Sequence, residues 1–457
     1  METTDCSSRK KLEPWHIRVR PPSHGDSYDA HHPTWILLDV RAYIDDRQNE
    51  TTAFVELSNG HQIQVTFCTA SPPLVSYICV WCPTGLDPVE LFRSSPTVEA
   101  VNADLVLIRI NARPVEYLVY QARGPSLTLL EKRVKRPYCY LPEPYNIALL
   151  PHGGGLGFKI CTLDSDFTRD ASNFNLCVFD SVSRKWNRQP LCLDQLNNPP
   201  DDEMLHVTEK VVYLGEQAIA FVDLWRGMVI CNELGNRTGS YVPLPEEMIQ
   251  LERARGSHNT RDVAVIGGRL TAVRLRTCFY SDLGWCWDLC TWSKPVACLD
   301  EEDWREDFKL HSCDLLVDEE TRNIELLPTL PDRPPTAKLN VALPTICLTD
   351  ANVIYIMGKV RPSDHKAVVL TVNVANRRLL EVSVYDAERI ITFFDFSYTQ
   401  STISQYFTNS SGVNKNLKRP GVIPASYPRK KQAGNEPLQL DTGRDSETED
   451  GDAMVLE

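Results

Sequence analysis

Residues 175–191 read NLCVFDSVSRKWNRQPL and contain the pattern that decides the fold. An apolar run ends at Asp180, a short polar turn follows, and the chain re-enters the next strand at Trp186. Two short apolar runs separated by turn-forming residues predict antiparallel strands joined by a tight turn. The recurrence of this pattern predicts an all-β repeat protein. The further copies are residues 218–233 around Asp223, 313–328 around Asp318 and 368–384 around Asn373.

The spacing of the copies favours a β-propeller. From Asp180 to Asn373 the pattern advances in four steps that average about 48 residues, passing through Asp288 in the run GWCWDLCTW. A four-stranded propeller blade takes ~40–50 residues, so residues 34–400 have room for roughly seven blades. The steps are unequal, and another all-β arrangement, such as two stacked β-sandwiches, stays open.

The two ends of the chain differ in composition from its middle. Residues 1–33 are polar and predict a flexible lead-in to the propeller-like domain of residues 34–400. In residues 401–457 Ser, Asn, Gly, Pro and Lys replace the aliphatic residues, and a basic stretch precedes an acidic end. Low hydrophobicity and dense charge cannot offset the entropy lost on ordering, so we expect a disordered tail.

Local signals inside the domain predict two further elements. Asn59-Gly60 lies between two alternating apolar runs, which predicts a tight hairpin with a type I′ turn. A short helix is expected near residues 88–93.

The bulk composition limits the classes of partner. The chain has 457 residues, with 48 Lys and Arg against 61 Asp and Glu, for a net charge of −13. This balance argues against general nucleic-acid binding, which needs a basic surface. No apolar run approaches the ~18 residues of a membrane-spanning helix, and the N-terminus lacks the apolar core of a secretory signal. We therefore expect a soluble protein of the cytoplasm, the nucleus or both, without membrane contact, whose 15 cysteines are free thiols.

Several segments carry a family resemblance. They are WILLDVRAYIDD, LCVFDSVSRKW, VVYLGEQAIAFVDLWRGMVICNE with the following YVPLP, RDVAVIGGRLTAVRL and GWCWDLCTWSK. Together they resemble the plant, grass-expanded family of domain of unknown function 1618, over roughly residues 30–390 and most typically over 211–345. The family's style of repeat is similar to the β-propeller-like domains that follow F-boxes in plant substrate adaptors, which implies an interaction role. We find no helical F-box segment before Trp35.

Two sets of cysteines have spacings that metal or redox sites also use. Cys79 and Cys82 form a CxxC pair, but they lie in a predicted strand, where alternation places their thiols on opposite faces. The second set does not match a paired CxxC zinc template. We therefore interpret both sets as strand cysteines and expect no metal and no cofactor. The second set is Cys286, Cys290 and Cys298 with His311 and Cys313.

Two loops resemble ligand-binding motifs without completing them. Residues 152–157 read HGGGLG, but the Lys-Ser/Thr pair and the helix of a P-loop do not follow, so we expect a plain loop between strands. Asp164, Asp166 and Asp170 form a dense acidic turn, yet Arg169 stands where an EF-hand loop needs its glycine. We expect a solvated turn there and no calcium site.

The repeat aspartates favour a structural role. An Asp side chain accepts hydrogen bonds from nearby backbone amides and so fixes a turn, which we expect here in preference to partner contact. Binding residues lie mostly on loops, and aromatic and arginine side chains dominate protein interfaces. Trp225 and Arg226, which follow one of these aspartates, are therefore candidates for exposed partner-contact residues.

The tail contains two basic clusters. Nine residues separate them, and they resemble a slightly short bipartite nuclear import signal. The acidic end suits either a basic partner or simple solubilisation. One alternative function is therefore a nuclear regulatory protein that uses its acidic tail. The cluster residues are Lys418, Arg419, Arg429, Lys430 and Lys431.

No catalytic motif accompanies the predicted fold. The chain has no nucleophile elbow and no HExxH, so we assign no catalytic residue and expect a protein that is not an enzyme. The leading hypothesis is a non-enzymatic protein-interaction module with protein partners and no evident small-molecule ligand. The main alternative is a propeller enzyme, hydrolytic or glycan-processing, whose site is assembled from distant loops.

Overall fold

The structure confirms the expected all-β class. It is a computed structural model that describes residues 19–24, 32–83, 85, 87–130, 146–152, 157–165, 173–193, 206–215, 218–232, 238–250, 256–280, 284–299, 301–328, 335–361, 363–390 and 394–407. Within these residues 26 strands accompany a single α-helix and several short 3-10 helices. The 3-10 helices are η2 (Glu246–Met248), η3 (Ser257–Asn259), η4 (Val296–Cys298), η5 (Ser312–Asp314), η6 (Ile324–Leu326), η7 (Pro335–Lys338) and η8 (Ile403–Tyr406).

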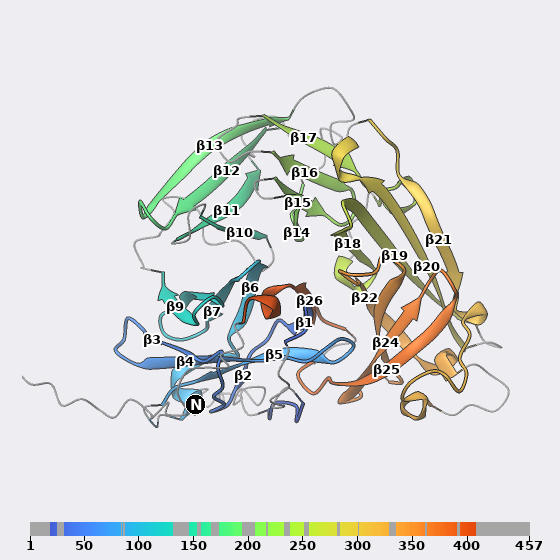
Figure 1. The fold of residues 1–457 in the computed structure, drawn as a ribbon, viewed down its shortest axis with the longest axis horizontal. Coiled ribbons are helices and arrows are strands. Elements are labelled where there is room, and N and C mark those ends of the chain that lie inside the picture. The colour runs from blue at the N-terminus through green and yellow to red at the C-terminus, as the bar shows by residue number, and fades with distance from the viewer. Residues whose placement is uncertain are drawn as a thin grey trace, which may run out of the picture. The chain divides into compact units, whose positions relative to one another are not determined.

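The strands of the folded unit form six blades around a central axis (Figure 1). Five blades are four-stranded antiparallel sheets that run, in chain order, from the strand nearest the axis to the outermost strand. Two of these blades join at their outer edges, where β13 pairs with β17 in parallel. The first three are β6 (Thr97–Asn102), β7 (Leu105–Ile110), β8 (Glu116–Gln121), β9 (Ser126–Leu129); β10 (Ile147–Pro151), β11 (Phe158–Ser165), β12 (Asn173–Asp180), β13 (Lys185–Leu193); and β14 (Lys210–Tyr213), β15 (Ile219–Asp223), β16 (Gly227–Cys231), β17 (Thr238–Pro243). The other two are β18 (Arg261–Ile266), β19 (Arg269–Tyr280), β20 (Gly284–Pro295), β21 (Arg305–His311); and β22 (Asn340–Ile346), β23 (Val353–Lys359), β24 (Lys366–Asn373), β25 (Arg378–Asp386).

The sixth blade contains both ends of the described chain. Its axial strand β26 pairs antiparallel with β1, and β1 pairs in parallel with β5. Because the last described strand pairs with the first, this blade closes the ring of sheets. The strands of this blade are β1 (Ile36–Asp39), β2 (Tyr43–Ile44), β3 (Ala53–Glu56), β4 (Gln62–Cys68), β5 (Val75–Trp81) and β26 (Tyr398–Ser401).

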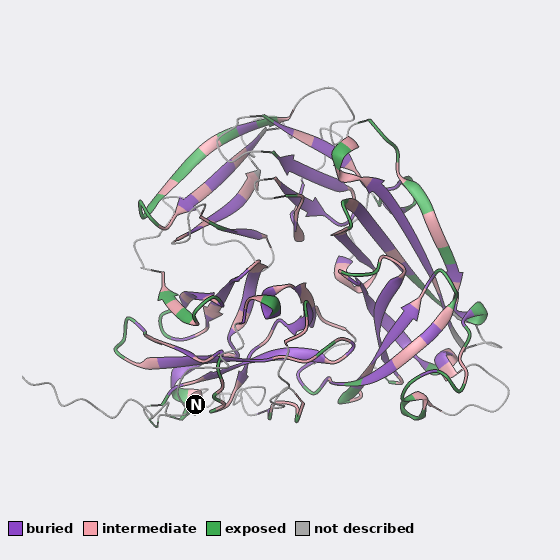
Figure 2. Cartoon of the chain, in the orientation of Figure 1, coloured by how far each residue is buried: buried purple, intermediate pink, exposed green. Residues whose placement is uncertain are grey.

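Hydrophobic clusters fill the interfaces between neighbouring blades. In β1, Ile36 and Leu38 face the β6–β9 blade, whereas Leu37 faces the β22–β25 blade, because successive strand residues point to opposite faces. Six such clusters each join two neighbouring blades. The inner and middle strands are consequently buried along most of their length, as Figure 2 shows. This double burial explains the continuous apolar runs in the sequence.

The expected propeller-like class is confirmed, but the described blades number six, one fewer than the roughly seven expected. The repeated sequence pattern marks hairpins at different radial positions. Residues 175–191 fall on β12 and β13, the outer pair of one blade, whereas residues 218–233 fall on β15 and β16, the middle pair of the next. The spacing of the pattern therefore does not measure the length of a blade.

The repeat aspartates fix turns at most of the expected positions. Asp180, Asp223, Asp318 and Asn373 each accept a hydrogen bond from the backbone amide two positions ahead, at 2.8 to 3.1 Å. Asp288 is an exception because it lies in the middle of β20, away from any turn. The turn at Asp318 also differs from the prediction, because it lies among 3-10 segments beside β25 and joins no strand pair.

The two local predictions inside the domain are confirmed in outline. The helix α1 (Pro88–Leu91) begins at Asp87, whose Oδ1 accepts the amide hydrogen of Val89 at 3.0 Å. Asn59-Gly60 lies in the hairpin loop between β3 and β4. The type I′ turn is wrong, however, because Gly60 has a positive φ of 82° whereas Asn59 is not among the described residues with positive φ.

The folded unit extends beyond the expected limits at both ends. Val19 is buried, and the Tyr77 hydroxyl donates a hydrogen bond to the Pro22 carbonyl at 2.9 Å, so part of the 1–33 segment packs on the blade. At the other end Phe407 is buried, beyond the expected limit at residue 400. Residues 1–18, 25–31 and 408–457 lie outside the described residues, so their disorder stays a prediction.

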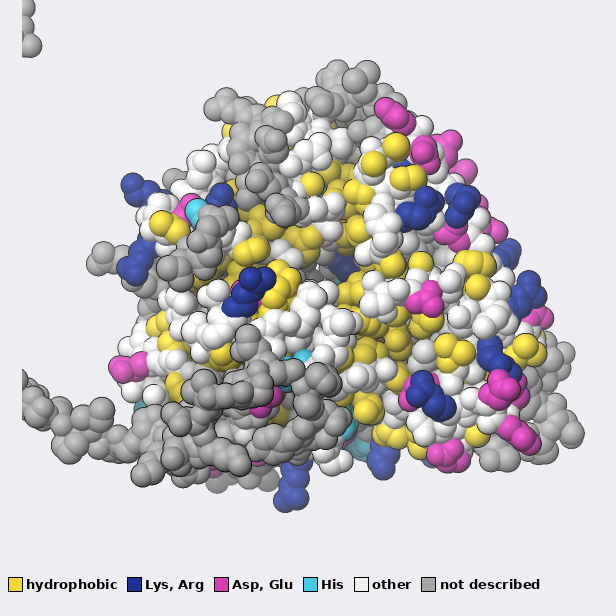
Figure 3. Space-filling model, viewed as in Figure 1, with side chains coloured by type: hydrophobic (Ala, Val, Ile, Leu, Met, Phe, Trp, Pro, Cys, Tyr) yellow, Lys and Arg dark blue, Asp and Glu magenta, His cyan; other side chains and the backbone are white. Residues whose placement is uncertain are grey.

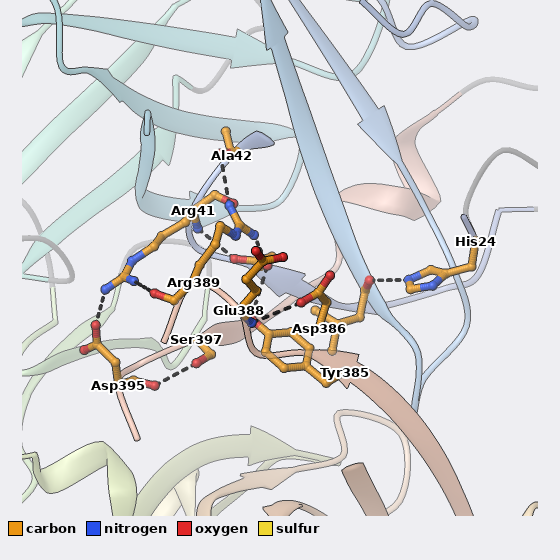
Figure 4. A network of polar contacts seen from close by, with 11 residues as sticks. His24, Arg41, Ala42, Tyr385, Asp386, Glu388, Arg389, Asp395 and Ser397 are labelled. Atoms are coloured by element: carbon orange, nitrogen blue, oxygen red, sulfur yellow. Dashed lines mark hydrogen bonds and ion pairs between the residues drawn. The ribbon is translucent and has the colours of Figure 1, made fainter. Parts of the chain in front are cut away.

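A buried ion pair fastens the first strand to the C-terminal part of the folded unit (Figure 4). Arg389 Nη2 lies 2.6 Å from Asp39 Oδ2, and the two side chains are 4% and 3% exposed. Arg389 Nη1 also donates to the carbonyl oxygens of Arg41 and Ala42, at 2.8 and 3.1 Å. The guanidinium carbon lies 3.5 Å from the centre of the Tyr43 ring. These contacts compensate the desolvation of both charges.

Candidate functional site

The innermost strands surround a cavity of about 270 Å³ on the axis of the ring. All six blades contribute lining residues, because each presents its axial strand, or the residues next to it, to the cavity. Figure 3 shows hydrophobic side chains gathered around the middle of this face, with charged side chains mostly farther out. The apolar wall of the cavity includes Val98, Ala100, Val211, Val263, Val265 and Leu348.

A polar cluster joins four axial strands beside the cavity. Lys210 Nζ on β14 contacts Asp262 Oδ1 on β18 at 2.5 Å and Gln400 Oε1 on β26 at 2.9 Å. Gln400 Nε2 donates to Asp262 Oδ2 at 2.6 Å. Asp262 Oδ2 also accepts the amide hydrogen of Ile346 on β22, at 3.0 Å. We call Lys210, Asp262 and Gln400 the axial clasp, since they connect four blades.

His258 lies next to the axial clasp, in η3 just before β18. Its Nε2 donates to the carbonyl oxygen of Glu209 at 2.9 Å, and its ring packs on Phe396 with centroids 4.2 Å apart. Burial among protein atoms lowers the pKa of His258 to about 4, and the positive charge of Lys210 acts in the same direction. Asp262 and the hydrogen bond to Glu209 oppose this shift. The imidazole is therefore neutral at pH 7, and its half-buried edge faces the cavity.

The lowered pKa of His258 predicts a loss of stability in mild acid. The unfolded chain takes up a proton at this histidine below about pH 6.5, whereas the folded chain does so only near pH 4. The stabilisation is thus complete above pH 6.5 and is lost as the pH falls towards 4. Between pH 7 and 5 the wild type is expected to lose about 1–2 kcal/mol more unfolding free energy than His258→Gln. Urea unfolding at both pH values measures this difference.

The matched control for that measurement is His365→Gln, which replaces an exposed histidine. Its pH dependence is expected to follow the wild type. Equal slopes for the wild type and His258→Gln would show that His258 ionises in the folded chain as it does in the unfolded one.

Glu99 brings a buried carboxyl group to the cavity wall. It is 1% exposed and sits at a β-bulge in β6, where the register with β7 shifts. Bulges re-aim side chains and are frequent beside functional sites. Burial raises the pKa of Glu99, while the Thr97 hydroxyl, which donates to its Oε1 at 2.5 Å, and the charge of Arg109 oppose the shift. A carboxyl group with a raised pKa is the kind of group that general acids use.

The predicted partner-contact pair is not a surface pair. Trp225 is 3% exposed, so the expectation that it is exposed is wrong. Its ring lies under Arg261, whose guanidinium carbon is 3.9 Å from the ring centre. The sequence shows that Trp225 follows a turn aspartate. It does not show that a residue of the neighbouring blade covers the Trp225 ring. Arg226 is half-buried.

The expectation that both cysteine sets occupy strands is met only in part. Cys79 lies in β5, and Cys286 and Cys290 lie in β20, whereas Cys82 directly follows β5, Cys298 lies in η4 and Cys313 lies in η5. Cys79 and Cys82 are both buried and belong to different hydrophobic clusters, which confirms that they point to opposite faces. In the second set, Cys286 and Cys313 are neighbours, whereas Cys290 contacts Arg274. Within the described part of the chain, no group of three or more His, Cys, Asp or Glu side chains has the arrangement to hold a metal ion.

Several predicted features lie outside the described residues. Most of the glycine run does so, at residues 153–156, as do two of the three clustered aspartates, Asp166 and Asp170. All residues of the proposed import signal also do so: Lys418, Arg419, Arg429, Lys430 and Lys431.

Reasoning from the sequence missed the cavity residues. Lys210, Asp262 and Gln400 are separated by 52 and 138 residues and share no local motif. The available signal was a charged residue at the start of an apolar run, as in KVVY and RDVAVI. Lys210 and Asp262 both lie at the start of a strand that borders the axis.

The ring of radial, mostly four-stranded sheets defines the chain as a β-propeller protein. The family model described as Protein of unknown function (DUF1618) matches residues 221–355, and it supports the resemblance seen in the sequence. A comparison with curated proteins gave no match.

Solved structures similar to this chain include three with low scores. An ancestral GH74 enzyme has a TM-score of 0.30 and 10% identity, over 78% of this chain and 39% of that chain. The WD40 domain of SCAP from fission yeast has a TM-score of 0.27 and 10% identity, over 74% and 77% of the two chains. The NanB sialidase from Streptococcus pneumoniae has a TM-score of 0.22 and 11% identity, over 82% and 57%. This chain therefore spans about two fifths of the length of the GH74 enzyme, and at these scores the likeness carries no argument about function.

Helices able to cross a membrane are also absent from the described residues, where none has the required length and apolar character.

Proposed function

We propose that this protein is a non-enzymatic protein-interaction module, and that the axial cavity receives an apolar side chain of its partner. The observation that carries the proposal is the division of the cavity surface. Its charged side chains are each engaged by other groups of the protein, Glu99 by Thr97, Glu209 by the amide of Leu224 and Lys210 by Asp262, whereas apolar residues from several blades line the rest of the wall. An apolar pocket with few polar groups is the usual form of a binding site.

The chemistry of the polar groups supports binding in preference to catalysis. The Asp262 carboxylate accepts hydrogen bonds from Gln400 and Ile346 and pairs with Lys210. Glu209 Oε2 accepts the amide hydrogen of Leu224 at 3.2 Å. A general base must be able to reach a substrate proton, and these carboxylates are already engaged within the protein.

The family resemblance supports the same proposal by analogy. The similar domains that follow F-boxes in plant adaptors select protein partners. Plant origin, a protein partner and a cytoplasmic or nuclear location are the parts of the proposal that rest on this analogy.

Filling the cavity is expected to reduce partner capture strongly. Val211→Trp and Val265→Trp each place an indole at a half-buried position of the cavity wall. Each variant is expected to reduce capture of the specific partner from plant tissue at least tenfold, measured by affinity purification with quantitative mass spectrometry. Val182→Trp, at an exposed position in the β12–β13 turn, is the matched control and should retain capture.

Two results would contradict the proposal. Full capture by both cavity variants, once circular dichroism shows that they are folded, would place the interaction elsewhere. Turnover of chromogenic glycosides or esters by the wild type, lost in Glu99→Gln, would favour the hydrolase alternative, which rests on the raised pKa of the Glu99 carboxyl.

A further inference from the structure

Three cysteines form one row across the β18–β21 blade, on β19, on β20 and directly after β21. Cys278 on β19 is the register partner of Cys286 on β20. On the other side, Asp288 pairs with His311 in the antiparallel β20–β21 ladder. Continuing this register by two residues brings Cys286 opposite Cys313, which lies in η5 directly after β21.

A hydrogen bond confirms the continued register. The backbone amide of Trp287 donates to the Ser312 hydroxyl at 3.0 Å, so the two residues beside Cys286 and Cys313 also face each other. Directly opposed residues of antiparallel strands have Cα atoms about 4.5–5.5 Å apart. Disulfides need a Cα separation of about 4.4–6.8 Å, so the registered pair Cys278–Cys286 has a suitable spacing. The Cys313 side chain lies within interaction distance of the Cys286 thiol, which makes it the second candidate partner.

The three thiols differ in access to solvent. Cys278 and Cys313 are exposed, whereas Cys286 between them is 4% exposed. All three are free thiols. Burial, and then the neighbouring Cys313 thiol, raise the pKa of Cys286. An oxidant in solution therefore meets the two outer thiols first.

We propose that Cys278, Cys286 and Cys313 form an oxidation site in which Cys286 closes a disulfide with whichever outer cysteine a peroxide has oxidised. Opposed residues share one face of the sheet, so the thiols meet in pairs along a line. Neither the fold nor the proposed binding function assigns this role to them.

The reaction proceeds in two balanced steps with hydrogen peroxide as the oxidant. The thiolate of Cys313 or Cys278 attacks one peroxide oxygen, the O–O bond breaks, and a sulfenic acid forms. The leaving hydroxide takes up the proton that the thiol released and becomes the first water. The Cys286 sulfur then attacks the sulfenic sulfur, the S–O bond breaks, and the hydroxyl group leaves as a second water with the Cys286 proton. Two thiols thus lose two electrons to one peroxide molecule.

The expected product is a disulfide that always contains Cys286. Folded wild-type protein is treated with hydrogen peroxide, the remaining thiols are alkylated, and non-reducing peptide mapping with tandem mass spectrometry locates the linkages. We expect Cys286 linked to Cys313 or Cys278 in most of the oxidised protein. Cys286→Ala should lower the yield of intramolecular disulfide at least tenfold and leave the outer cysteines as sulfenic acids, which dimedone traps.

Matched variants separate this row from ordinary surface thiols. Cys313→Ser should shift the linkage to Cys278–Cys286, and Cys278→Ser should shift it to Cys286–Cys313. Cys192→Ser removes an exposed thiol on β13 and should change nothing. The inference fails if Cys286 remains fully alkylatable after peroxide treatment and denaturation while the outer cysteines are oxidised. It also fails if folded and urea-unfolded wild type give the same mixture of linkages.

Discussion

Replacing Arg389 by alanine is expected to destabilise the folded unit by about 3–5 kcal/mol, because the substitution leaves the buried carboxylate of Asp39 without its partner. The lost guanidinium also bridges the carbonyl oxygens of Arg41 and Ala42, next to β1. These contacts hold the first strand against the C-terminal part of the folded unit. Urea unfolding measures the loss, and faster hydrogen exchange in β1 and β26 would locate it.

The pH dependence of the variant provides a second measurement. Burial raises the pKa of Asp39, and the charge of Arg389 opposes that shift. Without the arginine, the pKa of Asp39 in the folded chain rises further above its value in the unfolded chain. The variant therefore keeps its stability in acid and loses it as the pH rises. The destabilisation of Arg389→Ala is therefore expected to grow from pH 4 to pH 7.

The control for Arg389 is an exposed arginine. Arg305, with a side chain 71% exposed, pairs with Asp307 on the surface of β21. Arg305→Ala is expected to cost about 0–1 kcal/mol. If Arg389→Ala cost no more than Arg305→Ala, the buried pair would not be what holds the first strand against the C-terminal part of the folded unit.

Replacing Asp262 by alanine is expected to cost a similar 3–5 kcal/mol. The substitution removes the acceptor shared by Lys210, Gln400 and the amide of Ile346, and it leaves a cation in a site where the lysine side chain is only 16% exposed. Because these groups come from four blades, the axial strands should loosen together. Hydrogen exchange of β14, β18 and β26 is expected to accelerate jointly, alongside a lower urea midpoint.

A double variant tests whether the cost comes from the unpaired charge. Asp262→Leu combined with Lys210→Met removes both ions, so it is expected to be more stable than Asp262→Ala. Asp303→Ala replaces an exposed aspartate and should change stability by less than about 0.5 kcal/mol. A double variant no more stable than Asp262→Ala would show that lost packing, not the unpaired lysine, causes the effect.

The sequence predicted the features that depend on neighbouring residues. The apolar run, the turn aspartate and the second run at Asp180 gave the β12–β13 hairpin correctly, because alternation and turn chemistry act within a few residues. Asn59-Gly60 marked a hairpin for the same reason, although the turn type was wrong. The opposite orientations of Cys79 and Cys82 followed from the two-residue period of a strand.

Features that depend on packing between blades were missed or wrong. Trp225 has the residue type of an interface anchor, but Arg261 from the neighbouring blade covers it. The blade count was one too high because the repeated pattern marks hairpins at several radial positions. The Cys278–Cys286–Cys313 row follows from strand register, which no spacing along the chain specifies.

The amino-acid sequence by itself determined that short apolar strands and tight turns build this protein, since those preferences are local. Only the tertiary structure decided that Lys210, Asp262 and Gln400 meet on one axis, and that Asp39 meets a partner 350 residues away. The physical reason is ring closure. The pairing of β26 with β1 fixes the distances between all axial strands at once, and no single segment contains that constraint.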